Sequence, residues 1–194
     1  MIATSPTPTI ATALWPASAH SLMRSALLAI AGSGLLWISA KVQVPFWPVP
    51  MTMQTLVVLA LGAALGWRLG LVTVALYLLE GAAGLPVFAG TPDKGLGLAY
   101  MVGPTGGYLV GFMAGVALIG CLAARGWDRS IPWMFTAMML GHVVILICGW
   151  AWLATLIGPE KAWIAGVAPF YLATLVKTAL AALALPAVWH LVKR

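Results

Sequence analysis

Six long apolar runs constrain this chain more than any other feature of its sequence. They cover roughly residues 22–40, 51–67, 69–86, 104–124, 132–157 and 164–190. Each is long enough, or nearly so, for the roughly 20 residues with which a helix crosses a bilayer. Hydrophobic residues make up 62% of the chain and charged residues 7%, more apolar surface than a soluble protein of this size can bury. The sequence therefore predicts an all-α integral membrane protein with a bundle of six transmembrane helices.

The segment before the first run has a different composition. Residues 1–21 are rich in Pro, Ser and Thr and lack the basic start and long apolar stretch of a secretory signal. We expect them to form a disordered tail and residues 22–194 to form one six-helix domain. Cys121 and Cys148 lie in apolar surroundings without metal-site spacing, so we interpret them as packing residues.

The basic residues indicate how the bundle lies in the membrane. Six spans place both termini on one side, with Arg24, Arg68, Arg125, Arg129, Lys193 and Arg194. The opposite side has Lys41, Lys94 and Lys161. The positive-inside rule then predicts a cytoplasmic-membrane protein with both termini in the cytoplasm. Because the basic residues are spread singly over short loops, the net charge of +6 indicates orientation rather than nucleic-acid binding.

Two outer connections are unlike ordinary loops. Residues 41–50 contain three prolines, which exclude a helix, and residues 85–107 are rich in glycine and apolar side chains. Apolar loops of this kind are more stable against the bundle than in water. We expect both to form a roof over its outer mouth.

Glu80 and Lys177 lie inside apolar runs, where a charge is costly without a partner. Their positions along the third and sixth runs place both in the outer half of the bundle, with side chains leaning toward each other. We expect both to face a ligand. Two alternatives are a structural ion pair between the spans and a lysine bonded to a backbone carbonyl.

Other polar side chains share this outer half. Tyr171 and Thr174 recur at three-residue spacing with Lys177, Tyr108 lies in the first turn of the fourth run, and Gln54 in the first turn of the second. Together they predict a small pocket. For the two tyrosines, a place in an interfacial aromatic belt is an equal alternative.

His142 is the remaining ionisable residue inside a run. It could carry protons, but a neutral histidine hydrogen-bonded within the bundle is the favoured interpretation. No nucleophile or metal triad is placed beside it, and no phosphate loop is present. We therefore expect neither an enzyme nor a bound metal or cofactor, and no ATP hydrolysis by this chain alone.

The first run carries small residues at four-residue spacing. Ser25, Ala29 and Ser33 form a ridge that allows close approach of another helix. We expect this ridge to dock a partner subunit, and packing within the bundle is the alternative.

Three ordered motifs are specific enough to indicate a family. They read Pro45-Phe-Trp-Pro-Val-Pro-Met-Thr-Met-Gln-Thr-Leu56, Leu76-Tyr-Leu-Leu-Glu-Gly-Ala-Ala-Gly-Leu-Pro-Val-Phe-Ala-Gly90 and Gly103-Pro-Thr-Gly-Gly-Tyr-Leu-Val-Gly-Phe112. From about residue 23 to 190 the chain resembles the BioY family, the biotin-binding S components of energy-coupling factor transporters. The resemblance implies high-affinity biotin capture from outside, with a transmembrane T subunit and paired cytoplasmic ATPases as partners, and favours partner docking on the ridge. A different small vitamin, a stand-alone carrier and a homo-oligomer are the open alternatives.

A fourth family motif is altered in this chain. Family members often carry Pro-Phe-x-x-Gly-Asp-x-x-Lys, with the Asp and Lys in the site, whereas residues 169–177 keep Lys177 and place Thr174 where the Asp stands. We hypothesise that Glu80 supplies the missing carboxylate, accepting from the ureido N–H groups while Lys177 donates to the ureido carbonyl. This hypothesis predicts that Glu80→Gln weakens biotin binding more than Lys161→Ala.

The same resemblance assigns expected roles to the outer loops. Apolar walls for the thiolane ring and alkyl chain are expected from Phe46, Trp47, Val87, Phe88 and Tyr108. Lys94 is the first expected partner of the tail carboxylate and Lys41 the second. Lys94 as a surface charge without a role is the alternative.

Overall fold

The computed structural model describes residues 8–15, 22–44 and 47–192. Five helical stretches in this part of the chain are long and apolar enough to cross a membrane. They are α2 (Leu22–Lys41), α3 (Gln54–Ala82), α5 (Gly106–Ala123), α6 (Ile131–Ile157) and the pair α7 (Pro159–Gly166) and α8 (Tyr171–Val192). The prediction of an all-helical membrane bundle is confirmed.

Helix α3 turns back on itself and supplies two crossings. Gly66, inside it, has φ +79°, a left-handed conformation that glycine adopts without strain. The Nε2 of Gln54 donates to the hydroxyl of Tyr77 at 2.7 Å. In a straight helix these residues would be about 34 Å apart. Residues 54–65 and 67–82 therefore lie antiparallel, in agreement with the six expected runs.

Short elements fill the connections at both ends of the bundle. These are α1 (Ile10–Leu14), β1 (Gln43–Val44), β2 (Met51–Thr52), α4 (Gly97–Met101), η1 (Trp127–Arg129) and η2 (Ala168–Phe170). Strands β1 and β2 pair antiparallel, with Gln43 opposite Thr52 and Val44 opposite Met51. The prolines of this connection exclude a helix, and the extended backbone that remains allows the small ladder.

The N-terminal segment is more ordered than expected. Helix α1 forms within it, Ile10 is buried, and the guanidinium of Arg24 donates to the carbonyl of Ala11 at 2.6 Å. The expectation of disorder is therefore wrong for residues 10–14, because Ile10 packs into the hydrophobic core. The rest of the expected tail, residues 1–7 and 16–21, lies outside the described residues.

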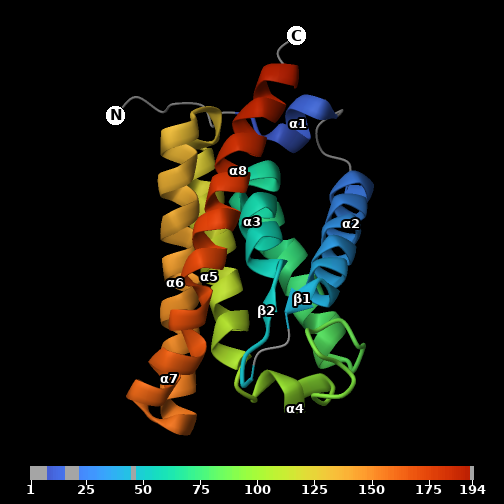
Figure 1. Cartoon of the computed structure of the whole chain (residues 1–194). Helices are drawn as coiled ribbons and strands as arrows, with labels where there is room; N and C mark the ends of the chain where they lie inside the picture. The colour runs from blue at the N-terminus through green and yellow to red at the C-terminus, as the bar shows by residue number, and fades with distance from the viewer. Residues whose placement is uncertain (1–7, 16–21, 45–46, 193–194) are drawn as a thin grey trace, which may run out of the picture.

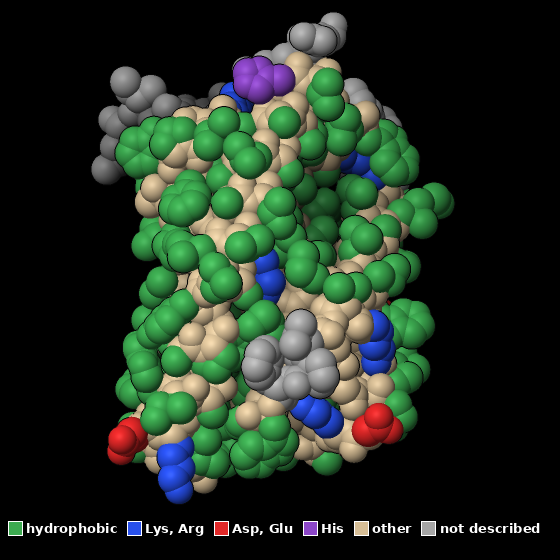
Figure 2. All heavy atoms as spheres, viewed as in Figure 1, with side chains coloured by type: hydrophobic (Ala, Val, Ile, Leu, Met, Phe, Trp, Pro, Cys, Tyr) green, Lys and Arg blue, Asp and Glu red, His purple; other side chains and the backbone are tan. Residues whose placement is uncertain are grey.

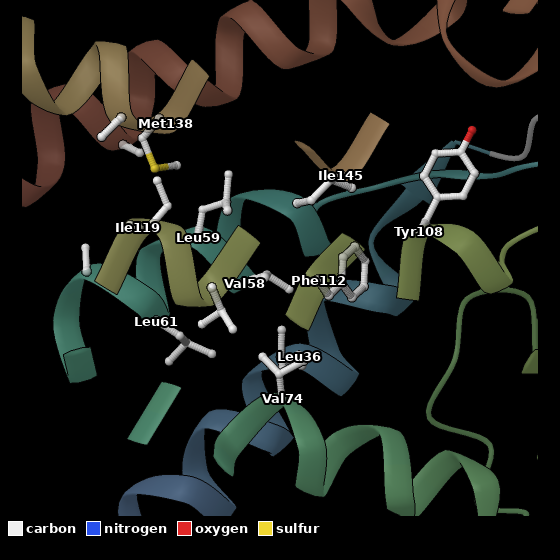
Figure 3. Close-up of a cluster of buried hydrophobic side chains, with 14 of the residues drawn as sticks. Leu36, Val58, Leu59, Leu61, Val74, Tyr108, Phe112, Ile119, Met138 and Ile145 are labelled. Atoms are coloured by element: carbon white, nitrogen blue, oxygen red, sulfur yellow. The ribbon is translucent and has the colours of Figure 1, made fainter. Parts of the chain in front are cut away.

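The core lies between α3, α5 and α6, with α2 and α8 on its flanks (Figures 1 and 3). Leu59, Ile119, Met138 and Ile145 meet there and are almost fully buried. Close approach of α5 and α6 depends on Gly111, whose missing Cβ would lie 2.8 Å from the Cα of Ile145. Small residues at helix contacts are a common feature of membrane bundles.

The face of the molecule shown in Figure 2 is apolar over most of its height. Large apolar side chains of the spanning helices are exposed, among them Leu27, Ile30, Ile147 and Leu183. Figure 1 places both termini at one end of the bundle and α4 and α7 at the other. An apolar band between two ends of this kind is the surface that a lipid bilayer covers.

Candidate functional site

One cavity lies within the bundle, on the half nearer α4 and α7. Its wall includes Gln54 and Thr55 of α3, Tyr108 and Phe112 of α5, His142 and Ile145 of α6, and Thr174 and Lys177 of α8. Val49 and Pro50 from the first outer connection and Ala89 from the second complete it. Both proline- and glycine-rich connections thus contribute to the roof, as the sequence predicts. The centre of a water-sized sphere can occupy about 50 Å³ of the cavity, and all empty space including open solvent at the mouth is about 600 Å³.

Lys177 places a buried ammonium group in this wall. The side chain is only 7% exposed, and its Nζ donates to the carbonyl of Thr52 and, at 3.2 Å, to the hydroxyl of Thr55. An ammonium has three N–H donors, so one remains for a ligand. Within the described residues no carboxylate pairs with it. The arrangement agrees with the alternative in which the lysine bonds a backbone carbonyl, and it leaves a cation facing the cavity.

Glu80 lies elsewhere. The hydroxyl of Ser33 on α2 donates to its carboxylate, and Glu80 is not among the described residues that line the cavity. The expectation that Glu80 and Lys177 meet in one chamber is therefore wrong. Both residues are at suitable depths, but Glu80 lies on the side of α3 that faces α2, while Tyr77 one turn earlier faces Gln54. The hypothesis that Glu80 supplies a carboxylate to the ligand site is therefore not supported by its position.

A hydrogen-bond network holds Gln54 in place at the cavity wall. Gln54 is 4% exposed and donates to the hydroxyl of Tyr77, which in turn donates to the carbonyl of Val87 at 2.9 Å. The hydroxyl of Thr52 bonds both the side-chain oxygen and the backbone N–H of Gln54, at 3.4 and 3.3 Å. The network connects both outer loops to α3, so it determines the shape of the cavity.

Tyr108 is part of the cavity wall rather than of an aromatic belt. Its ring is buried against Gly149 of α6, and its hydroxyl donates to the carbonyl of Gly166 at 2.6 Å. Its ring centroid is 6.4 Å from that of Phe170, which also lines the cavity. The interpretation of Tyr108 as pocket lining is thus supported by its position.

Tyr171 lies on the outer surface of the bundle, which agrees with the alternative of an aromatic belt. It is 48% exposed and packs edge-on against Trp163, with ring centroids 6.3 Å apart. This pair lies on a lateral surface groove rather than in the cavity. The expectation that Tyr171 lines the pocket is wrong. Each three-residue step leaves about 60° of rotation, so Tyr171, two steps from Lys177, lies about 120° from it around the axis of α8.

Four described loop residues expected in the site do not line the cavity: Trp47, Val87, Phe88 and Lys94. Phe88 is buried between Tyr100, stacked at 4.7 Å, and Tyr77, edge-on at 5.5 Å, so it supports the roof from within. Trp47 is 85% exposed and Lys94 is exposed on its loop. The expected contact residue Phe46 lies outside the described residues.

Lys41 connects the end of α2 to the second roof loop. Its Nζ donates to the carbonyls of Phe88 and Thr91 and to the hydroxyl of Thr91, each at 3.1 Å. In the same loop region, burial raises the pKa of Tyr100, whose hydroxyl donates to the carbonyl of Ala89. Lys41 thus has a structural role at the roof, where the sequence suggested a carboxylate partner.

The small-residue ridge of α2 packs inside the bundle. Ala29 and Ser33 are buried, and Ser33 bonds Glu80 of α3. Close approach of the two helices is visible at Gly32, whose missing Cβ would contact Thr73. The expectation of partner docking is wrong for Ala29 and Ser33, because α3 occupies that face, while Ser25 is exposed.

The structure adds residues that were not expected in the site. Thr55 and Thr105 bring hydroxyl groups to the wall, and His142 brings a ring nitrogen. Thr55 lies next to Gln54 in the first turn of α3, so the same depth argument would have found it. The described residues contain no group of three or more candidate metal ligands.

Together, the fold and the cavity define a helical integral membrane protein with a chamber in one half of its bundle. A sequence profile of the BioY family matches residues 10–194. The chain belongs to the BioY family.

Named relatives agree with this assignment. A probable biotin transporter BioY of Pyrococcus horikoshii is 38% identical over 144 residues, covering 74% of this chain and 83% of the relative. The biotin transporter BioY of Thermotoga maritima is 38% identical over 162 residues, covering 83% and 93%. The crystal structure of an S-component for biotin from an ECF-type ABC transporter superposes with a TM-score of 0.73 at 23% identity, covering 89% of this chain and 92% of that one.

Proposed function

We propose that this protein captures biotin in the cavity around Lys177 and serves as the substrate-binding component of an uptake system. The observation that carries the proposal is a buried ammonium with a spare N–H at the wall of an otherwise mostly apolar cavity. The ureido carbonyl of biotin accepts such a hydrogen bond, and its thiolane ring fits beside Phe112, Ile145 and Leu146. The names of the 38% identical relatives support the same ligand.

We infer that the cavity opens to the outside of the cytoplasmic membrane. Among the described residues, the end with α1 has four Lys and Arg residues and the end with α4 and α7 has three. The positive-inside rule places the first end in the cytoplasm. Biotin then enters beneath the two outer loops, with its ring toward Lys177 and its carboxylate toward the mouth. Lys94, exposed on the second loop, is the candidate partner of that carboxylate in the closed complex.

Energised uptake in this proposal needs further subunits. The sequence contains no phosphate-binding loop of its own. A transmembrane subunit and cytoplasmic ATPases of the energy-coupling factor type are therefore the proposed partners, supported by the structural similarity to an S-component of such a transporter. Their contact surface would not include Ala29 and Ser33, which α3 covers.

A titration of the purified full chain with biotin tests the ligand. We expect saturable binding of one biotin per chain and competition by desthiobiotin, which keeps the ureido group. Pentanoate, which matches only the tail, should not compete. The absence of saturable biotin binding, or equal competition by pentanoate, would contradict the proposal.

Glu80 gives a second prediction within the same titration. Because its carboxylate bonds Ser33 rather than the cavity, Glu80→Gln should change the Kd for biotin by less than about twofold, well below the effect of losing a hydrogen bond to ligand. Lys161→Ala, at an exposed position on α7, is the reference variant. A large loss in Glu80→Gln alone would mean that the carboxylate reaches the ligand after all.

A further inference from the structure

His142 brings an unusual group to the cavity wall. Its side chain is only 2% exposed, and it lines the cavity together with Thr174 and Lys177 of α8. The Nδ1 atom lies 2.9 Å from the carbonyl oxygen of Met138 and 3.2 Å from the hydroxyl of Thr178. The Nε2 atom is buried and has no hydrogen-bond partner among the described residues. Thus Nδ1 has hydrogen-bond partners and Nε2 has none among the described residues.

The contacts of Nδ1 determine which nitrogen of His142 carries the proton. A carbonyl oxygen only accepts, so the proton of the neutral ring lies on Nδ1 and points to Met138. Nε2 then presents a bare lone pair. A second proton on Nε2 would place another buried positive charge in the same wall as the Lys177 ammonium, which the apolar surroundings oppose.

A buried acceptor without a hydrogen-bond partner is destabilising and therefore needs an explanation. The lining of the cavity contains no carboxylate among the described residues, so a ligand with N–H groups must find another acceptor. His142 lines the cavity, and its Nε2 is an acceptor that no described group of the protein engages.

We propose that Nε2 of His142 accepts a hydrogen bond from an N–H of the ureido ring while Lys177 donates to the ureido carbonyl. This assignment rests on the proposed function, because it names biotin as the ligand. A cyclic urea has a carbonyl acceptor flanked by two N–H donors. The cavity wall offers Lys177 as a donor to the carbonyl and His142 as an acceptor for an N–H. His142 is then a specificity residue that distinguishes a urea from rings without an N–H.

The test combines a change in the protein with a change in the ligand. Wild type, His142→Leu and His142→Gln are titrated with biotin and with biotin methylated at either ureido nitrogen. His190→Leu, at an exposed position near the end of α8, is the matched control. We expect His142→Leu to weaken biotin binding by about 10- to 100-fold, the effect of an unpaired N–H in a buried site. His142→Gln should recover part of this loss, because its amide oxygen can also accept.

The methylated biotins distinguish a ligand contact from a merely structural role of His142. Methylation of one of the two ureido nitrogens should weaken binding to the wild type strongly. The same methylation should weaken binding to His142→Leu much less, because that variant has already lost the acceptor. Equal losses in both proteins, or unchanged biotin affinity in His142→Leu, would overturn the assignment while leaving biotin as the ligand. Failure of wild type to bind biotin would instead reject the proposed function and this inference together.

A spectroscopic measurement covers the case in which the Leu variant does not fold. In wild-type protein with ¹⁵N-labelled histidine, the Nε2 resonance of His142 should be that of an unprotonated nitrogen and should shift when biotin binds. The resonances of the other histidines should not. An Nε2 resonance that is protonated before biotin is added, or unmoved after it, would contradict the proposal.

Discussion

Replacing Lys177 by Met should weaken biotin binding by at least about 100-fold, because a charged hydrogen bond is lost and the ureido carbonyl is left unpaired in a buried site. The fold should survive. Met has a similar length, and because no described carboxylate pairs with Lys177, the change leaves no buried charge without its partner. The measurement is a biotin titration of the purified variant, together with its thermal unfolding in the absence of ligand.

A matched control separates the position of Lys177 from the loss of a charge. Lys161→Met removes a lysine from an exposed site on α7 and should bind biotin as the wild type does. If Lys177→Met unfolds at the wild-type temperature and still binds biotin with unchanged affinity, Lys177 does not contact the ligand.

Gly149→Ala should have the second largest effect, on stability and on binding. A Cβ at this position would overlap the ring of Tyr108, which lies directly against Gly149. The ring must move, and its hydroxyl then loses the carbonyl of Gly166. Overpacking and the lost hydrogen bond together predict a destabilisation of roughly 2–4 kcal/mol. Because Tyr108 lines the cavity, biotin binding should weaken as well.

Gly34→Ala is the corresponding control for stability. Apart from its chain neighbours and the backbone of its own helix, no described atom lies within 4 Å of the Cβ that this change adds. Gly34 is inside α2, where alanine favours the helix. Its unfolding temperature should equal or exceed that of the wild type. A Gly149→Ala protein as stable as Gly34→Ala would show that the wall around Tyr108 is not closely packed.

The transmembrane organisation could be predicted because it depends on the length of apolar runs. The short second run was separated from the third because Pro50 and Trp67-Arg68 bound it. The depth of a residue also follows from its position along a run, which explains why Gln54, Tyr108, Thr174 and Lys177 were correctly expected to share one cavity.

Rotation about a helix axis could not be predicted in the same way. The runs are apolar on all sides, because lipid and core are both apolar, so periodicity gives no direction for a polar residue. Glu80 and Tyr171 were at the expected depth but face Ser33 and Trp163. Loop residues such as Phe88 were misplaced for a related reason, since composition shows that a loop packs down but not which side chain reaches the cavity.

The central claim is that biotin occupies the cavity between α3, α5, α6 and α8 with its ureido ring at Lys177. The most direct measurement is an experimental structure of the biotin-bound protein. We expect the ureido oxygen within hydrogen-bond distance of the Nζ of Lys177. Biotin located beside Glu80, or on the membrane-facing surface with this cavity closed, would contradict the account.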